Sequence, residues 1–329
     1  MSVALIFPAQ GSHSPGMLHH LLDHPAVVRT LDEISEVLHS DVRDLDSEQN
    51  LQSDVSVQFA LFAEGIATAR ALMEQDIRPA AVSGLSVGAF GAAVAAGVLS
   101  LHDAVELVRL RAEQMMHLYP TGHGLSVIVG LSESQVTKIV EATSSDQAPV
   151  FVGNINAPRQ IVIAGSYVGM DRALDEARHQ GARKAVRLNV SGPAHCPLLQ
   201  PVADILARRI STLTLGTPQV TYVANVNARA LRTKELVASD LANNIAHGVR
   251  WHDAAEVLKQ LGCNLFLEMP PGNTLSDLAR QNLGGIISVP VEARVLSRVL
   301  RLAQQEQAGA QANARRKETT NHHFHGLHE

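Results

Sequence analysis

The sequence predicts a two-part α/β protein, in which a small unit is inserted into a larger α/β domain. Short apolar runs alternate with amphipathic segments along most of the chain, and 46% of the 329 residues are hydrophobic, enough for a large core. Between residues 125 and 191 the predicted order is strand, helix, strand, strand, helix, strand, which is typical of a ferredoxin-like βαββαβ unit. We therefore expect a discontinuous large domain over 1–124 and 192–305, a small subdomain over 125–191, and a flexible tail over 306–329.

Composition and charge exclude several classes of protein. The net charge of −5 and the pI of about 6.3 argue against binding to nucleic acid or to an anionic membrane. No apolar run is expected to reach the length of a transmembrane helix, and the N-terminus lacks the basic region of a signal peptide. Cys196 and Cys263 form no motif, so we expect a cytoplasmic protein without a disulfide framework or a metal site.

The first part of the chain reads as one strand followed by helices. Residues 3–7 are apolar and run into Pro8, which predicts a strand that delivers a loop. Helices are predicted over 26–38 and 56–73 from their apolar periodicity, and a further amphipathic helix over 104–116 follows Ser100.

The small unit and the remainder of the chain can be read in the same way. In the small unit we predict strands over 125–130, 150–154, 160–165 and 184–190, and helices over 132–142 and 167–180. After it, helices are predicted over 197–213 and 251–261, and strands over 220–225 and 264–268. The tail contains His322, His323, His325 and His328, which could trap a metal ion incidentally but have no fixed scaffold.

The most informative motif is Gly84-Leu-Ser-Val-Gly88, between a predicted strand over 79–83 and a predicted helix over 89–98. A Gly-x-Ser-x-Gly sequence on a strand-to-helix turn is a nucleophile elbow, in which the serine occupies a strained backbone conformation and its hydroxyl is presented at the sheet edge. The glycines avoid side-chain clashes in this tight turn. The sequence therefore predicts Ser86 as a nucleophile, against the alternative of a chance match.

Further motifs occur in a specific order around the elbow. They are Phe7-Pro-Ala-Gln-Gly11, the helix segment around Arg111, Asn154-Ile-Asn156, Ser191-Gly-Pro-Ala-His195, Val249-Arg250-Trp251 and Glu268-Met-Pro-Pro-Gly272. In order and spacing they resemble the malonyl-CoA:acyl-carrier-protein transacylases over roughly residues 3–300. The resemblance implies an α/β-hydrolase-like core with a ferredoxin-like insert.

The resemblance also implies the residues that perform the chemistry. A serine hydroxyl needs a base, and His195 matches the position at which the family has one. The family orients that histidine with a backbone carbonyl, expected here near Arg250, and no acidic residue of a catalytic triad is evident. The two backbone N–H groups of the oxyanion hole map to Val87 and Gln10, although Gln10 could also be an ordinary loop residue.

Three residues are expected to bind the substrate: Arg111, Asn156 and, from the resemblance, Arg250. The resemblance assigns Arg111 to the free carboxylate of a malonyl group, which a guanidinium can bind through two hydrogen bonds. From periodicity alone, an arginine in this amphipathic helix would belong to a solvated face. Asn156 resembles a pocket residue of the family, but it could equally form the turn before Pro158.

The sequence departs from the fatty-acid-synthesis members of the family at two positions. Those enzymes usually have histidine where this chain has Leu85, and glycine where it has Ala9. These features look more like the malonyltransferase (epsilon) subunit of biotin-independent malonate decarboxylase. The resemblance then implies malonyl-CoA as donor, no bound cofactor, and an acyl carrier protein subunit with a phosphopantetheine-type arm as partner, alongside the other decarboxylase subunits. A fatty-acid-synthesis transacylase is the alternative.

Other functions predict different features. A serine hydrolase would share the elbow and His195, but it would normally have an acidic triad residue and no need for Arg111. A non-catalytic scaffold would not need Ser86. A basic cluster of Arg178, Arg183, Lys184 and Arg187 precedes His195; it is either a docking patch for an acidic carrier or a solvated edge that protects an exposed strand.

Overall fold

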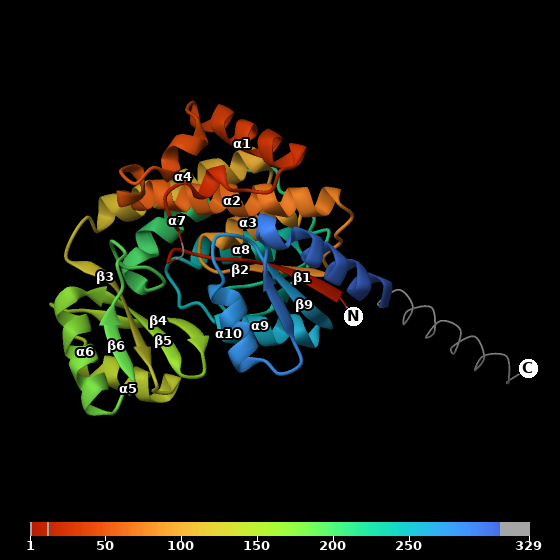
Figure 1. Cartoon of the computed structure of the whole chain (residues 1–329). Coiled ribbons are helices and arrows are strands. Elements are labelled where there is room, and N and C mark those ends of the chain that lie inside the picture. The colour runs from red at the N-terminus through yellow and green to blue at the C-terminus, as the bar shows by residue number, and fades with distance from the viewer. Residues whose placement is uncertain (1, 12, 310–329) are drawn as a thin grey trace, which may run out of the picture.

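Two β-sheets organise the protein in the computed structural model, which describes residues 2–11 and 13–309 (Figure 1). The larger sheet has the strand order β10-β9-β1-β2-β7-β8. Its strands are β1 (Ser2–Phe7), β2 (Ala81–Gly84), β7 (Thr221–Val223), β8 (Ala230–Leu231), β9 (Cys263–Glu268) and β10 (Ile287–Pro290). All neighbours in this sheet are parallel except the β7–β8 pair. The carboxyl ends of β1 and β2 therefore meet at one edge, where Phe7 pairs with Gly84.

Helices cover both faces of the larger sheet (Figure 1). One layer contains α1 (Pro25–Leu38), α2 (Asp54–Glu74), α3 (Gly88–Ala95), α4 (Leu101–Leu118), α7 (Gln200–Ile210) and α8 (Lys234–Asn243), and the other contains α9 (Trp251–Gln260) and α10 (Thr274–Asn282). Alternate residues of β1 enter the two cores: Leu5 and Phe7 pack into the first, and Ala4 and Ile6 into the second. A parallel strand buried on both faces is apolar at successive positions, which explains the run at the N-terminus.

The smaller sheet is built from the middle of the chain. Its elements follow one another as β3 (His123–Val129), α5 (Glu133–Thr143), β4 (Val150–Ala157), β5 (Gln160–Ser166), α6 (Tyr167–His179) and β6 (Lys184–Arg187). The strand order is β4-β5-β3-β6, and all three pairings are antiparallel. A capping box of Ser132 and Gln135 begins α5, and both helices pack on the sheet through a third apolar core.

Backbone hydrogen bonds join the smaller sheet to the larger part of the protein. The N–H of Ile155 donates to the Val249 carbonyl over 2.8 Å, and the N–H of Val249 donates to the Gly153 carbonyl over 2.9 Å. These bonds hold the middle of β4 close to the segment that precedes α9. The smaller sheet is thereby fixed beside the edge at which β1 and β2 end.

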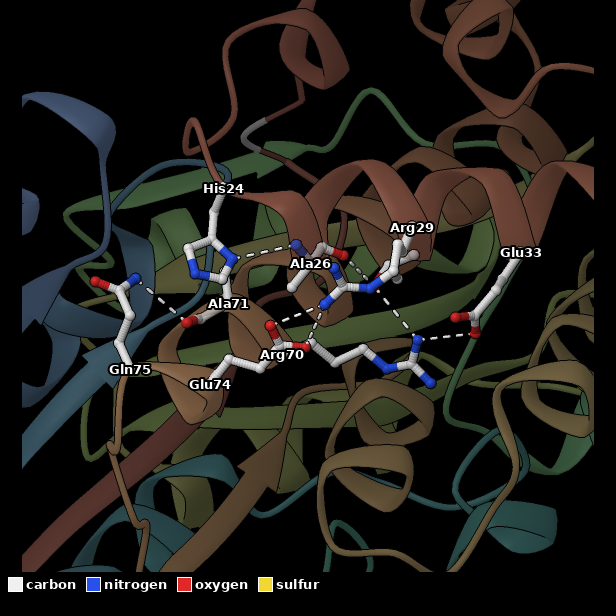
Figure 2. Close-up of polar contacts among 9 residues, drawn as sticks. His24, Ala26, Arg29, Glu33, Arg70, Ala71, Glu74 and Gln75 are labelled. Carbon is white, nitrogen blue, oxygen red and sulfur yellow. Dashed lines mark hydrogen bonds and ion pairs between the residues drawn. The ribbon is translucent and has the colours of Figure 1, made fainter.

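Ion pairs tie α1 to α2 at the surface of the first helical layer (Figure 2). Arg29 on α1 bonds both carboxylate oxygens of Glu74 on α2, and Arg70 on α2 bonds Glu33 on α1 over 2.9 Å. These pairs are exposed to water and contribute little individually. The main interaction that holds α1 to α2 is therefore the packing of their apolar residues.

The predicted elements correspond to the described ones with modest shifts at their ends, but several short elements were not predicted. The elements without a predicted counterpart are β8, α8, β10 and α10, and the single helix predicted over 197–213 is a 3-10 turn at Pro197–Leu199 followed by α7. Residues 296–309 are helical, whereas the four histidines of the tail lie outside the described residues.

The expectation about apolar length was wrong for α2. This helix of 21 residues is long and apolar enough to cross a membrane by length and composition, although 83% of its apolar window is buried inside the protein. Its apolar character follows from its place at the centre of the first core.

Candidate active site

The turn between β2 and α3 places Ser86 in a left-handed backbone conformation, with φ of 56°. Few residues other than glycine adopt this conformation, and it is a source of strain. The chain passes very close to itself here: a Cβ on Gly84 would lie 2.2 Å from the Gly88 carbonyl, and one on Gly88 would lie 2.4 Å from the Phe7 carbonyl. The glycines at both positions are therefore required by backbone packing.

His195 lies against the Ser86 hydroxyl although 109 residues separate them in the chain. Its Nε2 is 2.8 Å from Ser86 Oγ, and its Nδ1 is 2.6 Å from the carbonyl oxygen of Asn244. A carbonyl only accepts, so Nδ1 carries the proton and Nε2 is free to accept the serine proton. This is the tautomer that a general base requires.

Arg111 on α4 is buried beside the same hydroxyl and is only 2% exposed. One of its terminal nitrogens donates to Ser86 Oγ over 2.9 Å, and the other donates to the Gln58 amide oxygen on α2. Its Nε–H has no hydrogen-bond partner among the described residues. The guanidinium therefore lies against the Ser86 hydroxyl and keeps one N–H unpaired within the described part of the chain.

Burial sets the charge states of the site. Desolvation and the neighbouring Arg111 lower the pKa of His195 to about 3, so its imidazole is neutral at neutral pH. Desolvation lowers the pKa of Arg111 to about 9, which still leaves the guanidinium charged at that pH. Burial raises the pKa of the adjacent Cys196 thiol to about 12, so this thiol does not compete as a nucleophile.

The predicted oxyanion donors lie at the ends of the two central strands. The N–H of Val87 forms no hydrogen bond with any other residue that the structure describes. Gln10 follows β1, and its side-chain amide donates to Asp54 at the start of α2 over 3.0 Å, which anchors the loop. The two strand ends are adjacent in the sheet, so both backbone segments border the region of Ser86.

A cavity of about 690 Å³ opens at this point between the two sheets. Ser86, Arg111 and His195 line one side, and residues of the smaller sheet line the other. Asn154 and Asn156 are among the latter, and the side-chain oxygen of each is buried without a partner in the described chain. The structure thus brings Asn156 to the wall of the cavity that Ser86 lines.

Arg250 does not lie where the sequence analysis placed it. Its guanidinium bonds Glu133 on α5 and Asp253 on α9, outside the cavity wall. The carbonyl that accepts from His195 belongs to Asn244, not to a residue next to Arg250. Arg250 instead links the smaller sheet's first helix to α9, so we assign it no contact with substrate.

Sequence reasoning missed three polar residues that support the site. Asn225 bonds the Ser86 N–H and the Gly84 carbonyl, Gln58 holds Arg111, and Asn244 holds His195 through its carbonyl. The first two become neighbours of the site only through the fold. A backbone carbonyl carries no residue-type signal at all, so Asn244 could not have been found from the sequence.

Comparison with known proteins agrees with this geometry. The chain matches the acyl transferase domain family over residues 4–326. It is 31% identical over 295 residues to the malonyl CoA-acyl carrier protein transacylase of Haemophilus influenzae, covering 88% of this chain and 94% of that protein. It is 32% identical to the Escherichia coli K12 protein of the same name, covering 84% of this chain and 92% of that one. The chain belongs to the malonyl-CoA:acyl-carrier-protein transacylase family.

Solved structures of this family have the same mixed α/β fold. The acyl-carrier-protein S-malonyltransferase of Burkholderia pseudomallei superposes with a TM-score of 0.87 at 31% identity, covering 92% of this chain and 100% of that one. A malonyl-transacylase solved in complex with a type II PKS acyl-carrier protein superposes with a TM-score of 0.84 at 32% identity, covering 89% of this chain and 96% of that one. This transacylase-family chain is accordingly an enzyme, an acyltransferase.

Proposed function

We propose that the protein transfers a malonyl group from malonyl-CoA, through an ester on Ser86, to the thiol of an acyl carrier protein. The observation that carries this proposal is the buried Arg111 guanidinium, 2.9 Å from Ser86 Oγ and with an unused Nε–H. A buried cation at this position favours a donor whose acyl group ends in a carboxylate. The names of the relatives support the same donor and acceptor.

In the first half-reaction, His195 Nε2 accepts the Ser86 proton while Oγ attacks the thioester carbonyl carbon. The N–H groups of Val87 and Gln10 stabilise the resulting oxyanion. The tetrahedral intermediate collapses, the carbon–sulfur bond breaks, and the proton on His195 passes to the departing CoA thiolate. The products of this step are malonyl-Ser86 and free CoA.

The second half-reaction is the reverse of the first with a new thiol. His195 accepts the proton of the carrier's thiol, and the sulfur attacks the carbonyl carbon of the serine ester. Collapse of the intermediate breaks the ester bond and returns the proton to Ser86 Oγ. The carrier leaves as a malonyl thioester. The unpartnered side-chain oxygen of Asn156 in the cavity wall supports a role for this residue in holding the carrier's arm.

We further propose that the acceptor is the carrier subunit of a malonate decarboxylase, with that complex's other subunits as partners. Leu85, which lines the cavity beside the nucleophile, and Ala9 support this specificity. The fatty-acid-synthesis carrier is the second candidate, supported by the transacylases to which the chain is similar. Comparing kcat/KM for the two purified carriers tests the choice: equal or higher efficiency with the fatty-acid carrier would reject the decarboxylase assignment.

The architecture supports two further inferences. We infer an α/β-hydrolase-like large domain over 1–124 and 192–305 with a ferredoxin-like insert over 125–191, because the inserted elements follow the βαββαβ order. The β3 strand begins at His123, close to the inferred boundary. Both cysteines are free, which supports a cytoplasmic location.

Intact-protein mass spectrometry after mixing with malonyl-CoA tests the central proposal. The parent protein should gain one malonyl group, and Ser86→Ala should gain none. Ser83→Ala is the matched control, because its hydroxyl is buried and donates to the Val223 carbonyl instead of facing the cavity. A malonyl adduct on Ser86→Ala would reject Ser86 as the nucleophile, and release of free malonate faster than transfer to the carrier would favour a thioesterase.

A further inference from the structure

A second cavity, of about 680 Å³, lies apart from the active-site cavity. The loop after β1 lines both of them, with Gln10 and His13 in the active-site wall and Ser14 and Met17 in the wall of the second. The described linings have no residue in common. The acyl-transfer chemistry therefore leaves the second cavity without an assigned role.

Two polar side chains of α2 face this cavity without partners. Glu64 is 5% exposed and Thr68 is fully buried, and both line the cavity. Glu64 Oε2 and Thr68 Oγ1 have no hydrogen-bond partner within the described part of the chain. Residues four apart lie on the same face of a helix, so the two oxygens can serve one ligand. Buried polar atoms nearly always have a hydrogen-bond partner. Two neighbouring oxygens without one therefore point to a ligand that would supply the hydrogen bonds.

The charges around Glu64 favour a cation. Burial, helped by the nearby carboxylate of Asp46, raises the pKa of the Glu64 carboxyl to about 8. Asp46 is already occupied by the Leu18 N–H and by His19, and Glu292 in the cavity wall pairs with Arg294. The remaining ionisable residue in the described lining, His20, bonds the Gly16 carbonyl. Glu64 is thus the acidic residue of this wall that lacks a cationic partner.

The rest of the wall decides what kind of cation fits. Met17, Leu21, Leu22 and Val291 supply apolar surface to the same cavity. The described residues contain no group of three or more acidic, histidine or cysteine side chains able to hold a metal ion. A cation beside Glu64 would favour the ionised form of its carboxyl, whereas an anion would oppose it. We propose that this cavity binds a protonated alkylamine, with its ammonium group donating hydrogen bonds to Glu64 and Thr68 and its alkyl chain against the apolar wall.

Isothermal titration calorimetry with n-butylammonium chloride on the full chain tests this site without using acyl transfer. We expect saturable one-site binding to the parent, weakened about tenfold or more by Glu64→Gln and less strongly by Thr68→Val. Glu74→Gln is the matched control, because this carboxylate of the same helix is exposed and pairs with Arg29 (Figure 2). The Glu74→Gln variant should bind the amine with the same affinity as the parent. Sodium butyrate, which has the same chain and the opposite charge, should not bind.

A second readout locates the ligand. In protein labelled with 13C at the methionine methyl groups, the amine should shift the Met17 signal along a saturable curve that matches the calorimetric affinity. Met115, which lines the active-site cavity, should not respond. Absence of saturable binding to the parent, equal affinity in Glu64→Gln, or a response at Met115 instead of Met17 would each overturn the proposal.

Discussion

The side chain of Asn225 clamps the turn that carries Ser86. Its Oδ1 accepts a hydrogen bond of 3.0 Å from the Ser86 N–H, and its Nδ2 donates one of 2.8 Å to the Gly84 carbonyl. Asn225 is itself held by the buried carboxylate of Asp240, which accepts from its backbone N–H over 3.0 Å. One amide therefore holds the backbone that leads into a strained residue, and the Asp240 carboxylate holds that amide's own residue in turn.

Asn225→Leu should slow acylation of Ser86 by about ten- to a hundredfold, because small displacements of a nucleophile have effects of this size. The variant should also be less stable by about 1–3 kcal/mol, since two backbone groups lose their partners. Stopped-flow acylation and thermal unfolding measure the two effects. Asn243→Ala is the control, because that amide bonds only within its own helix. Unchanged acylation in Asn225→Leu would show that the turn holds without the clamp.

His195→Ala should reduce acylation by about 10²–10⁴-fold, the usual range for loss of a general base. Since burial and Arg111 lower the pKa of His195 to about 3, the parent's base is unprotonated at neutral pH. The single-turnover rate should therefore be flat through neutrality and fall only in acid, in contrast to the inflection near 6.5 of an ordinary histidine. Arg111→Gln should move the acid limb to higher pH, because a positive charge next to the imidazole is removed. An inflection near neutrality in the parent would contradict this prediction.

Arg111→Ala should impair malonyl-CoA far more than acetyl-CoA. Hydrogen bonds to charged groups are worth about 1.5–3 kcal/mol, so the ratio of kcat/KM values for the two donors should fall by about ten- to 150-fold. Arg109→Ala provides the control: it lies two residues earlier on α4, bonds the Val37 carbonyl and pairs with Glu106. Equal losses with both donors would mean that Arg111 only supports the packing around Gln58 and Ser86.

The basic cluster on the smaller sheet gives a prediction about the carrier. Arg178 and Arg187 are engaged by Asp175 and Asp171, whereas Arg183 is exposed and forms no ion pair among the described residues. Lys184 lines the active-site cavity, which makes Arg183 the cleaner test of docking.

Arg183→Glu should raise the KM for an acidic carrier at low salt and leave acylation by malonyl-CoA unchanged, and the effect should fade as salt is added. Arg208→Glu on α7 is the control, because it makes the same change of charge elsewhere on the surface. If both variants alter the carrier KM equally, net charge and not a docking patch is responsible.

The buried carboxyl of Glu64 predicts a dependence of stability on pH. Burial and Asp46 raise its pKa from 4.5 to about 8, so between these values the folded protein holds a proton that the unfolded chain has released. Stability from this group is therefore fully present below pH 4.5 and is lost as the pH rises through 8. Relative to the parent, Glu64→Gln should become progressively more stable between those limits in thermal unfolding. A constant difference across this range would show that Glu64 ionises normally.

The parts of the site that lie in one short segment could be predicted from the sequence. The elbow around Ser86 depends on local backbone geometry, and the glycines that this geometry requires are visible in the sequence. Arg111 shows the limit of such reasoning, because helix periodicity alone favours a solvated face whereas the fold buries it against Gln58. Its hydrogen-bond partner Gln58 lies on a different helix, and the periodicity of one helix contains no information about a residue on another.

The fold followed the same rule. Long apolar or periodic segments such as α2 were predictable, whereas β8 with two residues and β10 with four are too short for a pattern to emerge. The helix α10 begins where Glu268 accepts hydrogen bonds from the Leu275 and Ser276 N–H groups, and this cap lies on the preceding strand instead of next to the helix. The residue that caps the start of this helix is therefore brought there by the tertiary fold.

The order of segments along the chain has a consequence for biosynthesis. Ser86 emerges from the ribosome well before His195, and every strand of the smaller sheet lies between them. Contacts between residues so far apart form late in folding, because a long loop must close first. Asn225, which clamps the turn of Ser86, emerges later still. The nascent chain therefore carries Ser86 without its clamp and without His195 until the intervening sheet and the strand that precedes Asn225 have been made.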